Sequence, residues 1–479
     1  MKPTDEQHKG TSQETERSSI STIDHIPDEV LLEIFDFYRQ GIHLYYHQWR
    51  KSHVWIDLAQ VCRKWRAVLF ASYSRLDLGA TVGPMRPLHI KTILSGPLPI
   101  FIDYRLKTRE ITGSPHWRLR NTLKHRDRVR EIAFQGCSST DFDKFFKETN
   151  CAFPALESIY LRFPMDYGQK LPDTFLGGPD RSYLHLRSLK LERVSLASIS
   201  EVLLSATALT DLSLQIDTVF GSSPETSLLT CLNGMPCLRH LSLYTSYIFL
   251  DFPLQPSTPK DIVPLSKLTS FRYVGHIVYL EALVAGLSTP SLRSVDIEFP
   301  IEPPIVHVPR FINEIEEHYH AVHVNLHKWL FRFTLLTNAE CIVDCKPRFK
   351  RESPYPELLM EMAGALSTRL STVEELRVTF DGADAIVWEN FIPWRRFLLQ
   401  FPGVKTLRTE GADNCCFARI LLQDHEWPDD VLTSLPALEE IQLGESLPES
   451  QRGPELAAFE PLVSVRQQAG RPVKVFFDL

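Results

Sequence analysis

The segment EEHYHAVHVNLH, residues 316–327, gathers side chains that could bind a metal ion. On a helix, Glu316, His320, His323 and His327 would align at steps of four, three and four residues, and imidazole suits zinc or copper. The same helix would also carry a regular buried stripe, formed by Ile312, Ile315, Tyr319, Val322 and Leu326. The stripe puts the histidines on the flank of the helix, so we expect a packed or solvated face and no metal centre.

Other motifs that carry chemistry are missing from the sequence. Cys415–Cys416 and the pair Cys341 and Cys345 lack the C-x-x-C spacing of a zinc site, and we expect core thiols there. The sequence contains no GxSxG, P-loop, GxGxxG or HExxH motif. We therefore expect a non-catalytic protein without a cofactor.

Charge, hydropathy and cysteine content limit which partners and which cellular compartment we expect for the protein. The run WRLRNTLKHRDRVR (117–130) is basic, but Leu119 and Leu123 at helical spacing predict an ordinary exposed helix. A formal net charge of −7 argues against nucleic acid or an anionic membrane as the main partner. The chain opens with no signal-peptide pattern, and no apolar run of about 18 residues could span a bilayer. Nine scattered cysteines fit a reducing compartment, so we expect a cytoplasmic or nuclear protein.

Most of the chain repeats one short apolar pattern, Leu-x-x-Leu-x-Leu, with Ile, Val or Phe allowed at the apolar places. LRSLKL (186–191), LTDLSL (209–214) and LRHLSL (238–243) are the most regular of ten copies. The copies start at Val129, Leu156, Leu186, Leu209, Leu238, Leu268, Leu292, Val373, Val404 and Leu438. The starts are 23 to 34 residues apart, except for one gap of 81 residues.

Each copy predicts one short strand with one buried side, because its second and third apolar residues alternate with polar ones. Segments such as YLEALVAGL (279–287) and SISEVLLSA (198–206) between copies read as helix or loop. One strand and one helix per repeat are the signature of a leucine-rich-repeat solenoid, with a parallel sheet on its concave side. PLPIFIDY (97–104) predicts an early strand and 249–264 a Pro-rich loop. The long gap must hold an irregular segment or hidden repeats, with a strand near 333–345.

The outward positions of these strands are the best candidates for a substrate site. They include the cations and aromatic residues Tyr160, Arg162, Lys190, His240, Tyr244, Arg272, Arg377 and Arg408. Arginine and aromatic side chains often anchor interfaces, and arginines can bind acidic or phosphorylated segments. Asp211, Asp296 and Glu298 interrupt the row, so an ordinary solvated sheet face remains the main alternative.

The N-terminal part predicts a separate helical unit. Residues 1–22 contain almost no large apolar residues and predict a disordered tail. In IPDEVLLEIFDFYR (26–39), Pro27 suits the first helical turn, and Asp28 and Glu29 complement the helix dipole. WIDLAQVCRKWRAVLF (55–70) predicts a second amphipathic helix with Leu58, Val61, Cys62, Trp65 and Val68 on one face. A unit of about 55 residues cannot bury all of this apolar surface, so a partner is expected.

The segments IPDEVLLEIF and LAQVCRKWR resemble the F-box, and the repeats that follow resemble the F-box/leucine-rich-repeat proteins, including the expanded sets of mushroom-forming fungi. The resemblance implies an α/β chain with a disordered tail at 1–22, a helical F-box at 23–78 and an irregular leucine-rich-repeat solenoid at 79–479. It places the adaptor-facing residues at Pro27, Leu31, Leu32, Ile34, Phe35, Val61, Cys62 and Trp65. Ile26 replaces the usual leucine, and residues 41–53 form an insertion that either loops out or covers the docking groove.

The function implied is that of a substrate receptor in an SCF-type cullin–RING ubiquitin ligase. The F-box would dock on a Skp-type adaptor, and the solenoid would hold a protein substrate near the ubiquitin-charged enzyme. The alternative is a leucine-rich-repeat interaction scaffold or inhibitor with no role in ubiquitin ligation.

Overall fold

The computed structural model describes the helices and strands of the chain and part of their connections. The described residues are 25–45, 54–73, 80–82, 98–105, 116–135, 147, 152–163, 185–194, 206–216, 224–245, 262–300, 307–313, 315, 318–327, 330–337, 341–348, 363–364, 366–381, 391–411, 414–422, 434–444 and 449–477. The predicted tail at 1–22, residues 46–53 of the insertion, 198–205 and 249–261 lie outside them.

The chain divides into two compact units, which are described separately. The first contains residues 1–82 and 86–101, and the second contains residues 83–85 and 102–479. The first unit holds the helices α1 (Asp28–Tyr45), α2 (Val54–Val61) and α3 (Arg63–Ala71) and the strand β1 (Ala80–Val82). The strand β2 (Ile100–Arg105), which was expected at 97–104, contains the point where the chain passes into the second unit.

The core of the first unit joins its two sequence motifs. It consists of Leu31, Leu32, Phe35, Leu58, Ala59, Val68, Leu69 and Leu98. The rings of Phe35 and Trp65 meet edge to face, with centroids 5.0 Å apart. Lys64 donates a hydrogen bond from Nζ to the carbonyl oxygen of Ile26, and Arg66 donates from Nε to the carbonyl oxygen of Ala59 at 2.9 Å. These contacts fix α3 against the start of α1 and the end of α2.

The second amphipathic helix expected at 55–70 is in fact two helices. Cys62 has an extended backbone between α2 and α3, and its Sγ accepts a hydrogen bond from the Trp65 backbone N–H at 3.4 Å. A cysteine that caps the next helix interrupts the i to i+4 ladder, so the chain turns there. Val61, the last residue of α2, is 51% exposed, whereas Leu58 and Val68 of the same predicted face are buried.

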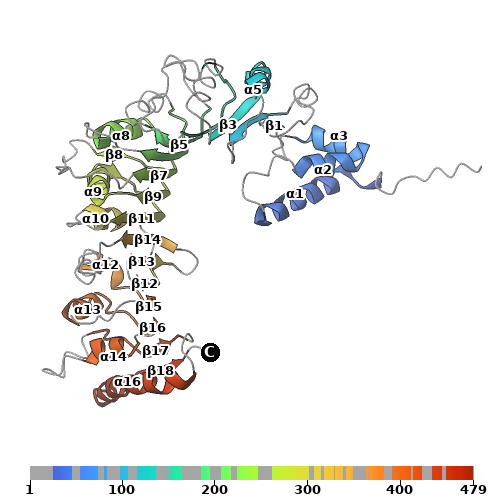
Figure 1. Ribbon diagram of the computed structural model, residues 1–479. Coiled ribbons are helices and arrows are strands. Elements are labelled where there is room, and N and C mark those ends of the chain that lie inside the picture. The colour runs from blue at the N-terminus through green and yellow to red at the C-terminus, as the bar shows by residue number, and fades with distance from the viewer. Residues whose placement is uncertain are drawn as a thin grey trace, which may run out of the picture. The chain divides into compact units, whose positions relative to one another are not determined.

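The second unit is built on a long, mostly parallel sheet (Figure 1). From β3 onward the strands lie in the order β3-β4-β5-β6-β7-β9-β11-β14-β13-β12-β15-β16-β17-β18. Their bounds are β3 Val129–Gln135, β4 Ser158–Arg162, β5 Ser188–Val194, β6 Asp211–Ile216, β7 His240–Thr245, β9 Ser270–Val274, β11 Ser294–Pro300, β12 Ala321–His327, β13 Leu330–Leu336, β14 Cys341–Arg348, β15 Glu375–Asp381, β16 Thr406–Glu410, β17 Glu440–Leu443 and β18 Lys474–Phe477. Each of the ten predicted repeat starts leads into one of these strands.

The apolar places of the repeat form continuous buried rows across neighbouring strands. Ile159, Leu189, Leu212, Leu241, Phe271 and Val295 are in register, and each is at most 2% exposed. The first apolar residue of each copy is also buried, as at Leu209 and Leu238, which lie just before their strands. One strand cannot bury these side chains alone, so each repeat is stabilised by its neighbours.

Helices on one side of the sheet cover this apolar face, as the second unit in Figure 1 shows. They are α5 (His116–Leu123), α8 (Pro224–Asn233), α9 (Ile277–Ala285), α10 (His307–Asn313), α12 (Ser367–Leu370), α13 (Phe391–Leu398), α14 (Asn414–Leu422) and α16 (Glu449–Gln468). The helix predicted in the basic run is α5, followed by the short 3-10 helix η3 (Arg126–Arg128). Leu119 and Leu123 point inward there, at 1% and 9% exposed.

The gap between Leu292 and Val373 interrupts the parallel order with a reversed meander. β14 pairs with β11 in parallel, β13 pairs antiparallel with both β14 and β12, and β12 pairs in parallel with β15. The single strand expected near 333–345 is thus two strands, β13 and β14. The Pro-rich loop expected at 249–264 ends in β8 (Val263–Pro264), which pairs in parallel with β10 (Leu287–Ser288).

Candidate functional site

The first candidate surface is an apolar stripe on α1. Val30, Ile34, Phe37 and Tyr38 follow one another at helical spacing and are 47%, 40%, 79% and 39% exposed. The opposite side of α1 carries the buried Leu31, Leu32 and Phe35. Large apolar side chains scattered singly on a surface are ordinary, but a contiguous apolar stripe marks a protein interaction site.

The eight predicted adaptor-facing residues fall into three environments. Pro27, Ile34 and Val61 are exposed, and Cys62 and Trp65 are half-buried. Leu31, Leu32 and Phe35 are in the core of the unit, at 0%, 8% and 1% exposed, so their predicted place on the surface is corrected. They hold α1 against α2 and α3, and the stripe that they support contains Phe37 and Tyr38, which the motif comparison had left out. The 3.6-residue spacing of apolar residues in IPDEVLLEIFDFYR indicates both the buried side of α1 and the exposed stripe.

The second candidate surface is the open face of the sheet, where the eight predicted substrate-binding residues lie. Tyr160, Lys190, Arg272, Arg377 and Arg408 lie in one row that crosses the sheet strand by strand, together with Ser213, Ser242, Asp296, Asp344, Thr334 and His323. Arg162 and Tyr244 lie in the next row, and His240 lies in the row on the other side.

Acidic partners on the same or a neighbouring strand pair with the cations of this face. Glu192 is 3.2 Å from Arg162 and 3.0 Å from Lys190, and it also accepts a hydrogen bond from Tyr160 at 3.2 Å. The further cross-strand pairs are His240–Asp211 (2.7 Å), Arg272–Asp296 (3.1 Å), Arg332–Asp344 (2.7 Å), Arg377–Glu410 and Arg408–Glu375 (2.9 Å). The face is a charge-balanced lattice and not a row of free cations, which weighs against an anionic ligand there.

His323 is the most enclosed titratable group named among the candidates on this face. Its Nε2 lies 2.9 Å from Thr379 Oγ1, and Arg377 is its register partner on β15. Burial lowers the pKa of His323 from its ordinary value, and the positive charge of Arg377 lowers it further. The fold therefore favours the neutral imidazole over the charged one.

The helix expected at 316–327 is wrong for residues 321–327, which form the strand β12. Val322 and Val324 are buried, and His323 lies between them on the other face of the strand, as the two-residue period of a strand requires. His320 lies before the strand, 4.0 Å from Glu374. The side chains of Glu316 and His327 lie outside the described residues, and within the described part of the chain no three His, Cys, Asp or Glu side chains form a group that could hold a metal ion.

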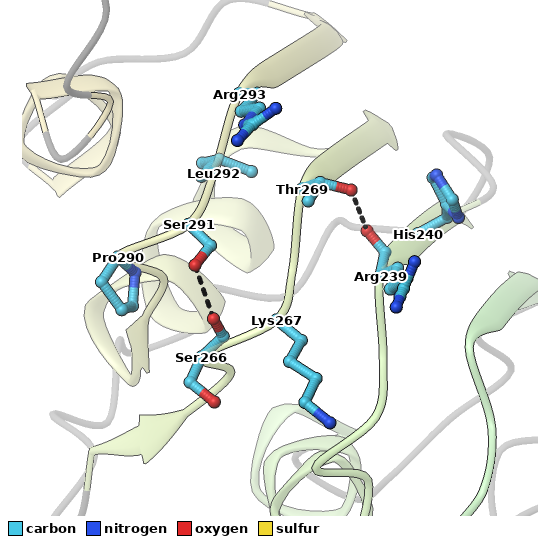
Figure 2. Close-up of a pocket in the computed structure, with 9 residues that line it drawn as sticks. All are labelled: Arg239, His240, Ser266, Lys267, Thr269, Pro290, Ser291, Leu292 and Arg293. Atoms are coloured by element: carbon cyan, nitrogen blue, oxygen red, sulfur yellow. Dashed lines mark hydrogen bonds between the residues drawn. The ribbon is translucent and has the colours of Figure 1, made fainter.

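A third feature, which the sequence did not predict, is a pocket of about 540 Å³ at the edge of the sheet where β7, β9 and β11 begin. Figure 2 shows that its lining comes from three neighbouring segments, which carry Arg239 and His240, Ser266 to Thr269, and Pro290 to Arg293. Ser291 donates a hydrogen bond to the Ser266 carbonyl oxygen at 2.7 Å, and Thr269 donates to the Arg239 carbonyl oxygen at 3.1 Å. These two bonds fix the three segments against one another.

Comparison with known proteins gives no family and only a distant structural similarity. No protein-family model matches the chain, and no curated protein matches it. Among solved structures it is similar to the leucine-rich-repeat-containing protein LegL7 from Legionella pneumophila, at 12% sequence identity and a TM-score of 0.20, over 66% of this chain and 83% of that one. At that identity and TM-score the likeness carries no argument about function. In the part of the chain that the structure describes, no helix is both long enough and apolar enough to cross a bilayer.

Proposed function

We propose that this chain is a substrate-receptor subunit of an SCF-type cullin–RING ubiquitin ligase, whose helical unit docks on a Skp-type adaptor and whose solenoid binds a protein substrate. The observation that carries the proposal is the exposed apolar stripe of α1, formed by Val30, Ile34, Phe37 and Tyr38. The stripe lies within the segment whose sequence resembles the F-box, and among the described residues the buried core of this unit contains none of its four side chains.

The energetic case for a partner rests on the exposed fractions of these side chains. Covering a large apolar side chain that is now exposed contributes about 1.5–3 kcal/mol. Phe37 is 79% exposed, and three neighbours on the same side of α1 are 39–47% exposed. A partner with a matching apolar groove would gain from all four, in the way that an amphipathic helix binds in a groove.

The role of the solenoid in this proposal is to position a substrate. The sheet offers a long face that carries Tyr160, Tyr244 and several ion pairs, a composition suited to a protein surface that supplies its own polar groups. A substrate held there would meet the ubiquitin-charged enzyme at high effective concentration, which turns a slow bimolecular transfer into one within a complex.

The proposal is tested by co-expressing the chain with a Skp-type adaptor and measuring how much adaptor co-purifies. We expect stoichiometric recovery with the native chain and loss of recovery with the double variant Ile34→Glu, Phe37→Glu, because two carboxylates would have to be buried in an apolar interface. Leu399→Glu is the matched control, since Leu399 in the second unit is 41% exposed and Ile34 is 40% exposed.

Recovery of the adaptor by the double variant at the level of the control would overturn the proposal. Both substituted positions are on the surface, so circular dichroism should show the same helical content for the native chain and the variant. That comparison separates a lost interface from a lost fold.

A further inference from the structure

We propose that the pocket at the start of β7, β9 and β11 is the site where the solenoid binds an acidic, extended segment of a partner protein. The inference deepens the proposed function, on which its biological role rests, by naming the class of segment that a substrate would present. Its chemistry depends on the second unit alone.

The pocket carries cations that have no acidic partner. Arg239, Lys267 and Arg293 are exposed, and among the described residues none of the three forms an ion pair. The remaining lining is neutral except for His240, whose Nδ1 already lies 2.7 Å from Asp211. Lys267 extends toward the neighbouring repeat, where its Nζ lies 3.8 Å from the sulfur of Cys237 (Figure 2). Three cations in a pocket without a lining carboxylate favour an anionic ligand.

Arg239 and Arg293 occupy the same place in their repeats, directly before the strand, and the residue type at that place differs between the central and the C-terminal repeats. The residue before each strand donates its backbone N–H to the equivalent residue one strand earlier, as Arg239 does to Thr210 at 2.8 Å and Arg293 does to Thr269 at 2.9 Å. In the C-terminal repeats the same position alternates in sign, and Lys405 lies 2.8 Å from Glu374. In the central repeats it holds arginine and threonine, and among the described residues no carboxylate forms an ion pair with Arg239 or Arg293.

The spacing of the cations fits an extended polypeptide. Neighbouring strands are about 4.8 Å apart, so the backbones of Arg239 and Arg293, which flank Thr269, are about 10 Å apart. On an extended segment, side chains on the same side repeat at about 7 Å, within reach of two long arginine side chains. Arginine binds carboxylates with two parallel hydrogen bonds, and Lys267 adds a point charge to the same pocket.

A polypeptide is favoured over nucleic acid by the charge of the rest of the molecule. The chain carries a formal net charge of −7, and its sheet face is charge-balanced, so three cations at one edge offer a short patch rather than a track for a phosphate backbone. The hydroxyl groups of Ser266 and Ser291 and the apolar ring of Pro290 complete a lining that suits a peptide.

The test is fluorescence anisotropy of a labelled decapeptide of alternating Glu and Ser, titrated with the full chain in the absence of any adaptor. We expect saturable binding that weakens as salt is added, because the attraction is between exposed charges. The variant Arg239→Glu, Arg293→Glu should weaken binding by about tenfold or more, because it replaces attraction by repulsion. The control Arg396→Glu, Arg419→Glu makes the same charge change on two exposed helix positions and should stay within about twofold of the native chain.

Equal binding by the two double variants would overturn the inference, as would the absence of binding by the native chain. Tighter binding of a single-stranded RNA decamer than of the acidic peptide would also overturn it, in favour of a nucleic-acid surface. Adaptor recovery should be unchanged in Arg239→Glu, Arg293→Glu, so that failure at the pocket and failure of the α1 interface are read from separate measurements.

Discussion

At the scale of single residues, charge pairing decides what the sheet face can bind. Glu192 accepts a hydrogen bond from Tyr160 and forms ion pairs with Arg162 and Lys190. Each of the other predicted arginine anchors forms an ion pair with a carboxylate from a neighbouring strand. The residue types on the face were readable from the repeat, but their pairing depends on which strands are neighbours and in which register. The unpaired Arg239, Lys267 and Arg293 were missed because they precede the strands instead of lying on them.

His323 gives a prediction about pH at this scale. Its pKa is lowered in the folded chain by burial and by Arg377, so the unfolded chain binds more protons at this site. Stability from this group is therefore full above the unfolded pKa of about 6.5 and is lost as the pH falls toward the lower, folded pKa. We expect the native chain to lose more melting temperature than His323→Gln between pH 7.5 and pH 5. Equal losses of melting temperature in the two proteins over that pH range would contradict a contribution of His323 to the pH dependence of stability.

At the scale of elements, the sequence predicted the strands far better than their order. LRHLSL at 238–243 has two readable features, a buried turn leucine and a two-residue alternation, and β7 follows from them. The reversed order β14-β13-β12 depends on antiparallel pairing between distant residues, which no local pattern encodes. At 316–327 the helical period of 3.6 residues was chosen over the two-residue period of a strand. Val322, Val324 and Leu326 fit both periods, so the pattern alone did not separate them.

The turns between repeats give a stability prediction. A Cβ added at Gly403 would lie 2.6 Å from the backbone carbonyl oxygen of Ser371 in the preceding repeat, so two turns would have to separate. We expect Gly403→Ala to lower the free energy of unfolding by about 1–3 kcal/mol, measured by urea denaturation. Gly364→Ala is the control, because a Cβ at Gly364 meets nothing within 4 Å. If both variants unfold at the same urea concentration, close packing at Gly403 is contradicted.

The core of the first unit gives a prediction that separates packing from binding. Phe35 is 1% exposed against Trp65, so Phe35→Ala should destabilise the helical unit by about 3–5 kcal/mol. Phe37 lies two residues further along α1 and is 79% exposed, so Phe37→Ala should change stability by less than about 0.5 kcal/mol. Chemical denaturation followed by Trp fluorescence compares them. Equal losses for the two variants would place Phe37 in the core and remove it from the interface.

At the scale of the whole molecule, the chain presents two surfaces of opposite character on separate units. The stripe of α1 is apolar and lies in the F-box-like segment, whereas the pocket of the solenoid is cationic and lies at a sheet edge. Under the proposed function, the adaptor would bind the stripe and an acidic segment of the substrate would bind the pocket. Such a division between two binding sites is what a receptor that bridges two proteins would require.

The most direct test of the proposed adaptor docking is isothermal titration calorimetry, with a purified Skp-type adaptor titrated into the purified full chain. We predict a saturable one-to-one heat of binding with a Kd below about 1 μM, equivalent to a free energy of about −8 kcal/mol. We also predict a negative heat-capacity change on binding, because the stripe formed by Val30, Ile34, Phe37 and Tyr38 is apolar. A folded chain that gives no saturable heat with the adaptor at tens of micromolar, about ten times that Kd or more, would contradict the proposed docking.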